Sequence, residues 1–246
     1  MTVVGVDGCP EGWLAVTYDG MTYERAVVFE EFANLWERHS DAETVLVDVP
    51  VGLREASNDK RPCDAAARDV LGPRRSSVFP PPVRPAVYEE SYAAAKAVQE
   101  DRTAGSLGVQ SWHICPNIRE LDRLLCETAA DARGTVREAH PELCFWALAD
   151  ERPMINSKTG QPAAAFWERV DVLEGVDDDI LGEIRTAGSG LAGGASLDDL
   201  LDAFVLAVTA SDRTGPLQTL PPADSPAAER DPADLPMEMV YSKRRT

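Results

Sequence analysis

The first third of the chain alternates apolar and polar positions in the way that short β-strands require. Runs of β-forming residues cover 2–7, 12–18 and 23–29, and an Asp-Gly pair between the last two is a strong hairpin signal. Residues 30–39 change to helical spacing, and 44–49 form a nearly continuous apolar run, typical of a strand buried on both faces. The pattern predicts a three-strand meander, a helix and a central fourth strand.

The middle of the chain lacks strand patterns, so 53–133 is interpreted as a helical insertion after the fourth strand. Its apolar spacing predicts three helices, at 63–71, 88–99 and 117–132. The stretch 78–85 carries four prolines and must be extended or turning. Beyond the insertion, a strand is expected at 136–140 and a helix at 163–173.

The C-terminal third is predicted to hold one long helix and a tail. Gly188–Gly194 is expected to be a flexible loop, and Ser196 is placed to cap a helix that continues to about Ser211. Residues 215–246 contain six prolines among acidic residues, which suggests a surface tail with an edge strand at 237–241. The chain is therefore expected to form one α/β domain over 1–214, followed by this tail.

Composition narrows the class of protein. The 246 residues carry 24 basic and 42 acidic side chains, a net charge of −18, and only four of the basic ones are lysines. Such a chain repels polyanions in dilute buffer, but molar salt shortens the screening length to about 3 Å. A salt-adapted (halophilic) source is therefore expected, the alternative being an ordinary acidic protein from a GC-rich genome. No transmembrane run or secretory signal is found, and five scattered cysteines fit a reducing cytoplasm.

One segment keeps a positive charge. Between Arg54 and Arg84 there are seven basic and four acidic residues, so this stretch is +3 while the remainder is −21. A basic segment in an acidic chain is a candidate contact for phosphate. An ordinary ion-paired helix face would give the same count.

Several carboxylates stand where a lone charge is costly. Asp7 and Asp48 end the first and fourth apolar runs, and Asp198, Asp199 and Asp202 open the last long helix. A buried carboxylate costs several kcal/mol unless it is paired or binds a cation. Neighbouring strands that end at one edge would bring Asp7 and Asp48 together, and oxygen-only ligands suit Mg²⁺ or Mn²⁺.

Each acid also has a structural alternative. Asp7 could form an Asp-Gly turn, Asp48 could cap the following loop, and Asp198 and Asp199 could simply favour the helix N-terminus. If they instead hold two metal ions about 3.5–4 Å apart, they can activate water for phosphodiester hydrolysis without a side-chain nucleophile. The sequence has three histidines and no G-x-S-x-G or P-loop motif, so no other chemistry is indicated.

Seven blocks in order resemble a known family, the domain of unknown function 429 family, described as predicted ribonuclease-H-like nucleases. The blocks run from residue 3 to about 210; they are Val4–Cys9 with Gly12-Trp13, Asp48–Leu53, Cys63-Asp64 with Ala67-Arg68, Gly72–Pro80, His140–Glu142, Ser157–Thr159 and Asp198–Ala203. The resemblance implies an α/β, ribonuclease-H-like fold: a mixed five-stranded sheet flanked by helices. The last helix is also similar to that of Holliday-junction resolvases.

The resemblance also implies roles for individual residues. Asp7, Asp48 and Asp202, with Asp199 or Asp198, would be the metal ligands, and Glu142 a further ligand or general base. Lys158 would neutralise the scissile phosphate. Phosphate contacts would come from the block Arg74, Arg75, Ser76 and Ser77, where arginine binds phosphate in a bidentate manner. Surface or loop roles for Arg74, Arg75 and Lys158 are the alternatives.

The sequence is compatible with three functions. The first is a divalent-metal-dependent phosphodiester hydrolase acting on nucleic acid or a small phosphodiester. The second is a nucleotide-binding phosphotransferase of the actin and sugar-kinase class, with Gly188–Gly194 as its nucleotide loop. The third is a catalytically inactive binding module. Substrate identity and oligomeric state are left open by the sequence.

Overall fold

The computed structural model describes residues 1–191 and 194–245. Five strands form the main sheet: β1 (Thr2–Cys9), β2 (Gly12–Asp19), β3 (Thr22–Phe29), β4 (Thr44–Val47) and β5 (Val136–Glu138). Their order is β3-β2-β1-β4-β5. Strand β2 pairs antiparallel with both β1 and β3, and β4 pairs parallel with both β1 and β5. A helical insertion separates β4 from β5. This is a mixed sheet of ribonuclease-H-like topology, as expected.

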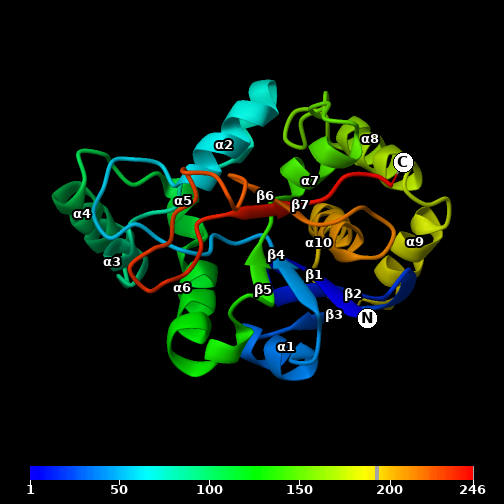
Figure 1. Cartoon of the computed structure of the whole chain (residues 1–246), viewed down its shortest axis with the longest axis horizontal. Helices are drawn as coiled ribbons and strands as arrows, with labels where there is room; N and C mark the ends of the chain where they lie inside the picture. Colours follow the sequence, from blue (N-terminus) through cyan, green and yellow to red (C-terminus); the bar gives the residue numbers. More distant parts are fainter. Residues whose placement is uncertain (192–193, 246) are drawn as a thin grey trace.

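Helices cover both faces of the sheet (Figure 1). Their bounds are α1 Phe32–His39, α2 Pro62–Leu71, α3 Arg84–Val87, α4 Tyr92–Arg102, α5 Val109–His113, α6 Cys115–Arg123, α7 Pro141–Leu148, α8 Pro162–Glu174, α9 Ile180–Gly190 and α10 Leu197–Ala210. Short 3₁₀ turns lie at Gly72–Ser77 and Ala130–Ala132, and a π-helical turn at Leu124–Thr128. In the part of the chain that the structure describes, none of these helices is long and apolar enough to cross a membrane.

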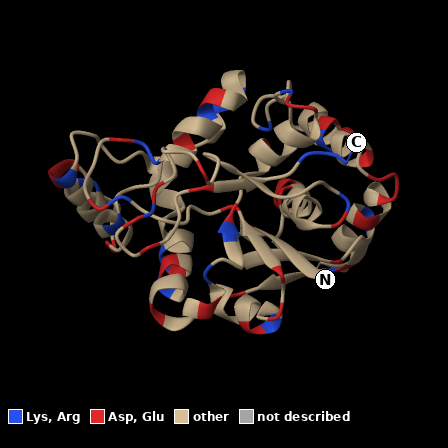
Figure 2. Cartoon of the chain, in the orientation of Figure 1, with Lys and Arg blue, Asp and Glu red and all other residues tan. Residues whose placement is uncertain are grey.

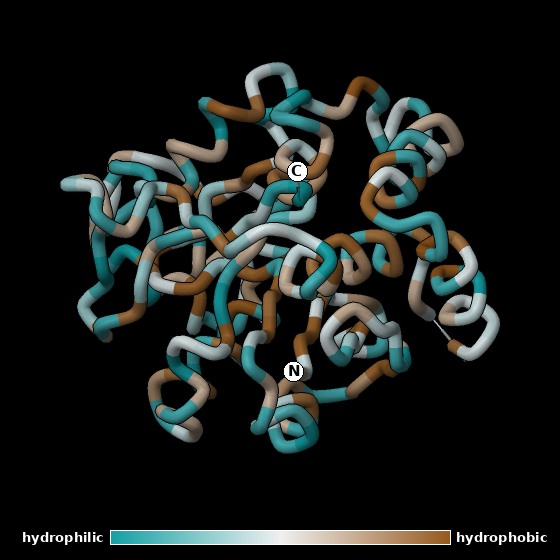
Figure 3. Tube along the Cα trace, turned by 45° about the vertical axis from the view of Figure 1, so that its right-hand side comes forward, coloured by the Kyte–Doolittle hydropathy of each residue, from teal (hydrophilic) through white to brown (hydrophobic). Residues whose placement is uncertain are grey.

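Strand alternation divides the core into two layers. Val3 and Leu46 face α7, α8 and α10, whereas Val4, Val6 and Val47 face α1 and α6. The hydropathy colouring shows apolar stretches along the strands and along the helices that pack on them (Figure 3). Acidic residues mark the outer helices α1, α4, α6 and α9 (Figure 2).

The insertion differs from the sequence prediction in its boundaries. The helix expected at 88–99 is observed as α4, three to four residues later, after the separate turn α3. The helix expected at 117–132 ends at Arg123 and continues as the π-helical and 3₁₀ turns. Two other expected helices, at 63–71 and 163–173, are confirmed as α2 and α8 to within one residue.

The C-terminal segment is more than a surface tail. β6 (Gln218–Leu220) and β7 (Met239–Tyr241) pair with each other, and Val240 bridges to Ala139 just after β5. Met237, Met239 and Val240 are buried in the layer that contains α7 and α10. The prolines set the path of the segment, but its apolar residues belong to the core.

Candidate functional site

The ends of β1 and β4 place two carboxylates on the same face of the sheet. Alternate residues of a strand point to the same face, so Asp7 shares a face with Val3 and Gly5, and Asp48 shares one with Leu46. Val3 and Leu46 pack in the layer that contains α10, so both acids lie toward this helix. The parallel pairing of Val6 with Val47, extended by a 3.0 Å hydrogen bond from Asp48 N to Val6 O, puts the two acids at matching positions. The expected convergence of these strand ends is thus explained by register.

Helix α10 approaches β1 closely because residue 5 has no side chain. A Cβ at Gly5 would clash with the backbone of Ala203 and Ala207. This close approach carries Asp202, on the first half of α10, toward Asp7. The glycine in the first strand is therefore a packing requirement of the site.

The carboxylates interact electrostatically. Burial raises the pKa of Asp7 well above its ordinary value, and the charges of Asp202, Asp48 and Asp199 raise it further. Burial also raises the pKa of Asp48, while His140 and Lys158 oppose the shift. The pKa of Asp202 is raised to about 6, mainly by burial, with Lys158 lowering it and Asp48 raising it. Such mutual repulsion in a buried place is the environment that a cation relieves.

Lys158 is the cation that the protein itself supplies. Its Nζ lies 2.6 and 2.5 Å from the two Asp202 oxygens, and both side chains are largely buried. The pairing raises the pKa of Lys158 against the opposing effect of burial. The lysine therefore stays charged and holds the Asp202 carboxylate in a fixed orientation.

Asp199 has a structural role in this structure. It is the third residue of α10 and forms a capping box with Ser196: Asp199 N donates to Ser196 Oγ at 3.1 Å, and Ser196 N donates to Asp199 Oδ2 at 2.8 Å. Its charge still reaches Asp7, whose pKa it raises. Asp198 is partly exposed on the same helical turn.

Glu142 is held by two arginines. It begins α7 after Pro141, and its oxygens accept from Arg74 Nε and Arg169 Nη2, both at 2.7 Å. Burial raises the pKa of Glu142, but the two guanidiniums outweigh burial and lower it. The expected ligand or general base is therefore already neutralised by side chains of the 3₁₀ turn and of α8.

The expected phosphate-binding block is split by the structure. Arg74, Ser76 and Ser77 line a cavity, whereas the exposed Arg75 does not. The Ser77 hydroxyl donates to Arg74 O at 2.8 Å, which fixes the 3₁₀ turn. Arg74 keeps its other guanidinium nitrogens free for a further acceptor beside Glu142, within the described residues.

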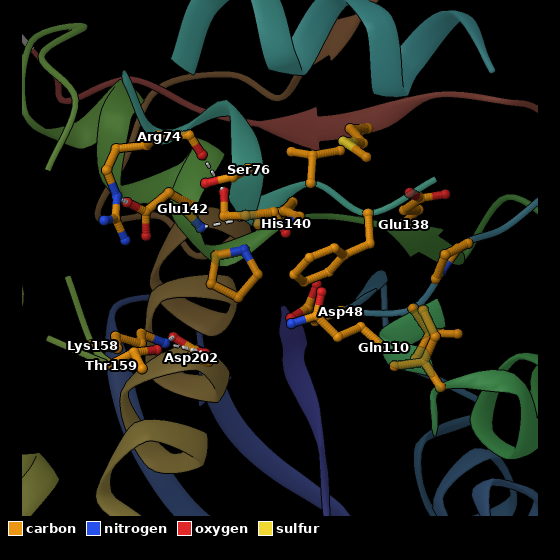
Figure 4. Close-up of a pocket in the computed structure, with 18 of the residues that line it drawn as sticks. Asp48, Arg74, Ser76, Gln110, Glu138, His140, Glu142, Lys158, Thr159 and Asp202 are labelled. Carbon is orange, nitrogen blue, oxygen red and sulfur yellow. Dashed lines mark hydrogen bonds and ion pairs between the residues drawn. The ribbon is translucent and has the colours of Figure 1, made fainter. Parts of the chain in front are cut away.

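The cavity joins most of the expected site (Figure 4). It has a volume of about 590 Å³, within the range of ligand pockets. Lys158, Thr159 and Asp202 lie on one side of the view, Gln110 on the opposite side, and Asp48 between them. Asp7 is buried and does not line the cavity.

A second acidic cluster adjoins this cavity through Glu138, which helps to line it. Among the described residues, Cys63, Asp64 and Glu138 are the one set of three whose ligand atoms lie within 4.8 Å of one another, as a metal site requires. The fully buried Arg61 already occupies this set: Nη2 lies 2.6 Å from Asp64 and Nη1 lies 2.8 Å from Glu138. Because a guanidinium supplies the compensating charge, we interpret the cluster as a buried ion-pair network.

That network fixes the loop after β4. Glu138 Oε2 accepts the N–H of Val51 at 2.7 Å, and Arg61 Nη1 donates to the carbonyls of Val51 and Gly52 at 3.1 and 3.2 Å. Burial raises the pKa of Glu138 to about 7, although Arg61 lowers it. The loop that follows Asp48 is thus tied to β5 and α2.

The donor set around Asp7 differs from that cluster, because it consists of carboxylate oxygens alone, the type of ligand that Mg²⁺ and Mn²⁺ take. Asp7 is buried, Asp48 and Asp202 line the cavity, and the charges of both raise the pKa of Asp7. Asp7 accepts a 2.8 Å hydrogen bond from Gly8 N, and no other donor to it is found in the described part of the chain. Among the described residues these oxygens are less tightly gathered than those of Cys63, Asp64 and Glu138.

Sequence reasoning missed three residues that shape the site. Arg169, which forms an ion pair with Glu142, lies four residues after Ala165 on the buried face of α8. A charged residue on an otherwise apolar helix face could have indicated its role. Phe79 and Gln110 line the cavity from the insertion; Phe79 falls within the block Gly72–Pro80 but was given no role, and no local pattern marks Gln110. Gly188–Gly190, expected in a loop, belong to α9, and residues 192–193 of that expectation lie outside the described residues.

Fold and site together define an α/β protein of ribonuclease-H-like topology with a carboxylate cluster at the edge of its central strands. The chain belongs to the family described as "Protein of unknown function (DUF429)", which matches residues 5–225. This confirms the resemblance seen in the sequence. Comparison with curated proteins and with solved structures finds no significant match.

Proposed function

We propose that the protein is a divalent-metal-dependent phosphodiester hydrolase, a nuclease. The observation that carries the proposal is that Asp7, Asp48 and Asp202 come together where β1, β4 and α10 pack: Asp7 is buried, Asp48 and Asp202 line an open cavity, and the charges of both raise the pKa of Asp7. Asp7, Asp48 and Asp202 would hold Mg²⁺ or Mn²⁺. Once bound, the ion activates water and stabilises the charge on the phosphate oxygens.

The other residues of the cavity bind and position the substrate. Arg74 and Lys158 present positive charge on the cavity wall, and the backbone and hydroxyls of Ser76 and Thr159 lie beside them. Phosphate bound there would compete with Asp202 for the Lys158 ammonium. Glu142, neutralised by Arg74 and Arg169, acts by holding Arg74 in place rather than by accepting a proton.

The alternative of a phosphotransferase loses its nucleotide loop, because Gly188–Gly190 are helical. An inactive binding module remains the main competitor. Activity and metal binding separate the two, since a binding module would not need the carboxylates to act together.

The test is hydrolysis of labelled single-stranded, duplex and branched DNA and RNA with Mn²⁺ in molar KCl. We expect cleavage that disappears with a chelator and falls at least 100-fold in Asp48→Asn and Asp202→Asn. Asp224→Asn, a change of an exposed acid far along the C-terminal segment, is the matched control and should leave the rate unchanged.

Calorimetric titration with Mn²⁺ provides an independent check. Wild-type protein should bind the ion with an affinity that drops at least tenfold in Asp7→Asn and in Asp48→Asn, while Asp64→Asn should not change it. Equal Mn²⁺ binding by all variants, or hydrolysis that survives in Asp48→Asn, would overturn the proposal.

A further inference from the structure

The cavity has a second half that the hydrolytic residues do not use. Besides its charged wall, it is lined by apolar side chains and one amide: Val49, Pro50, Val78, Phe79, Gln110, Ile114 and Met239. The proposed hydrolysis involves the acidic and basic side chains and does not require these apolar residues. Ligand sites that combine an apolar surface with a few polar groups recognise the organic part of a ligand.

Phe79 is an exposed aromatic side chain on a fixed backbone. It is 41% exposed, whereas its neighbour Val78 is buried. Arg68 Nη1 donates to Val78 O at 2.7 Å, and Ser111 Oγ donates to Pro80 O at 3.1 Å, so the backbone is anchored on both sides of the ring. An exposed aromatic ring on an anchored backbone can stack a nucleobase without the chain having to be ordered first.

Helix α5 supplies the other side of this half. Gln110 and Ile114 are four residues apart, so they lie on one face of the helical turn, and both line the cavity. The Ser111 hydrogen bond to Pro80 fixes that turn beside Phe79. The Gln110 amide offers both a donor and an acceptor, the pair of groups that a base edge presents.

The two halves are arranged as a nucleotide would need. Gln110 lies across the cavity from Lys158 and Asp202, with Asp48 between them (Figure 4). We propose that the apolar half holds a single unstacked nucleobase on Phe79, with Gln110 at its edge, while its phosphate lies by Lys158 and Arg74. The proposal rests on the proposed hydrolase function and narrows its substrate to single-stranded or frayed nucleic acid.

Charge supports a base-directed contact. The chain is −18 overall, and in molar salt the counterion-release contribution to nucleic-acid binding is small. Stacking on an aromatic ring does not depend on that contribution. A protein with this surface can therefore gain affinity from the base where it cannot gain it from a long run of phosphates.

The first experiment measures binding without turnover, in molar KCl and no divalent metal. Uridine and adenosine 5′-monophosphates are titrated against ribose 5-phosphate and inorganic phosphate. Both nucleotides should bind at least tenfold more tightly than ribose 5-phosphate, and Phe79→Ala should abolish the difference while Phe79→Trp keeps it. Val109→Ala, an exposed apolar change at the start of α5, is the control that should behave like wild type.

The second experiment compares substrates with Mn²⁺ present. A single-stranded oligonucleotide should be cleaved at least tenfold faster than the same sequence in a duplex, and Phe79→Ala should slow it by about 10- to 100-fold. A single-stranded oligonucleotide with one abasic residue should be cleaved poorly at the bond beside that residue. Bis(p-nitrophenyl) phosphate, which lacks a base, reports on hydrolysis itself.

The outcomes separate the two proposals. Nucleotide-selective binding that depends on Phe79, with no hydrolysis of any substrate, supports the base site and overturns the hydrolase function. Hydrolysis with equal rates on duplex and single strand, or equal binding of nucleotides and ribose 5-phosphate, overturns the base site and leaves the hydrolase function standing.

Discussion

At the scale of single residues, Arg61 and Lys158 both compensate the negative charge of carboxylates inside the fold, but in different ways. Each cation neutralises carboxylates that the fold has buried. Arg61 is 2% exposed and binds Asp64 and Glu138 together, whereas Lys158 holds one carboxylate at a cavity wall. Both cations lie beside the same cavity. The Arg61 guanidinium is used up by two carboxylates and two carbonyls, which suits a structural role, whereas Lys158 binds a single carboxylate and can also meet a ligand.

Removing Arg61 should therefore destabilise the protein strongly. Arg61→Met leaves two buried carboxylates without a partner, and we expect a loss of about 3–5 kcal/mol in the free energy of unfolding, measured by chemical denaturation. Arg25→Met, at a half-exposed site, should change it by less than about 0.5 kcal/mol. The contrary result has two parts: a chelator lowers the free energy of unfolding of the wild type, and Arg61→Met leaves that free energy unchanged. This result would assign the cluster to a metal.

The raised pKa of Asp202 predicts a pH dependence. In the absence of divalent metal, the folded protein binds a proton at Asp202 up to about pH 6, whereas the unfolded chain releases it near pH 4. Stability should therefore fall as pH rises from about 4 to 6, by roughly 1–3 kcal/mol from this group.

The comparison with Asp202→Asn isolates this effect. The difference in free energy of unfolding between wild type and variant should change across pH 4–6 and be level above about pH 7. A difference that does not change with pH would show that Asp202 titrates normally in the folded protein.

The placement of single residues could be predicted where it follows local alternation. Asp7 and Asp48 were identifiable because each ends an apolar run, and Asp202 because it interrupts an apolar helix face. The partners were not predictable, since Lys158 and Asp202 are 44 residues apart and Arg74 and Glu142 are 68 apart. Pairing across such distances is decided by tertiary packing, which no local pattern encodes.

At the scale of elements, the contact between β1 and α10 decides the geometry of the site. Gly5→Ala would force α10 away from β1, because the new methyl group meets helix backbone and not a flexible side chain. We expect a loss of at least 1–3 kcal/mol in stability and a drop in Mn²⁺ affinity, since Asp202 would move away from Asp7.

Gly182→Ala is the matched control for that change. Gly182 lies on α9 with nothing within 4 Å of the added Cβ, so alanine should stabilise the helix by up to about 1 kcal/mol and leave Mn²⁺ binding unchanged. A Gly5→Ala protein as stable as wild type would show that α10 can shift without cost.

Elements followed the sequence where periodicity was strong. The strands of the meander, β4, α8 and α10 were predicted to within a few residues, because each buries a regular apolar set. The glycines that end α9 misled the prediction, as did the prolines of the C-terminal segment. In the C-terminal segment contacts with the core outweigh the local preference for a loop, whereas the exposed glycines of α9 simply continue a helix whose Ile184 and Ala187 are buried.

At the scale of the whole molecule, the charge of −18 bears on both stability and binding. Many acidic side chains lie on the outer helices (Figure 2), whereas the cavity wall carries Arg74 and Lys158 beside its own acids. Like charges over a folded surface repel one another, and the unfolded chain relieves this repulsion by expanding. The protein is thus expected to gain stability from any condition that screens charge.

We therefore expect the melting temperature to rise as KCl increases from 0.05 to 1 M. Over that range the screening length falls severalfold, to about 3 Å, which shortens the reach of surface repulsion to single neighbours. A gain of roughly 1–2 kcal/mol would raise the melting temperature by about 2–8 °C for a chain of this size. Ion pairs such as that of Arg61 are buried and should be little affected.

A variant with less surface charge tests the cause of that rise. Glu37→Gln, Glu90→Gln and Asp224→Asn together remove three exposed negative charges that form no ion pair among the described residues. If repulsion limits stability, the triple variant melts higher than wild type at 0.05 M KCl and gains less from added salt. Equal salt slopes for the two proteins would instead attribute the effect of salt to hydration of the surface, and repulsion between the acidic side chains would then not limit the stability of the fold.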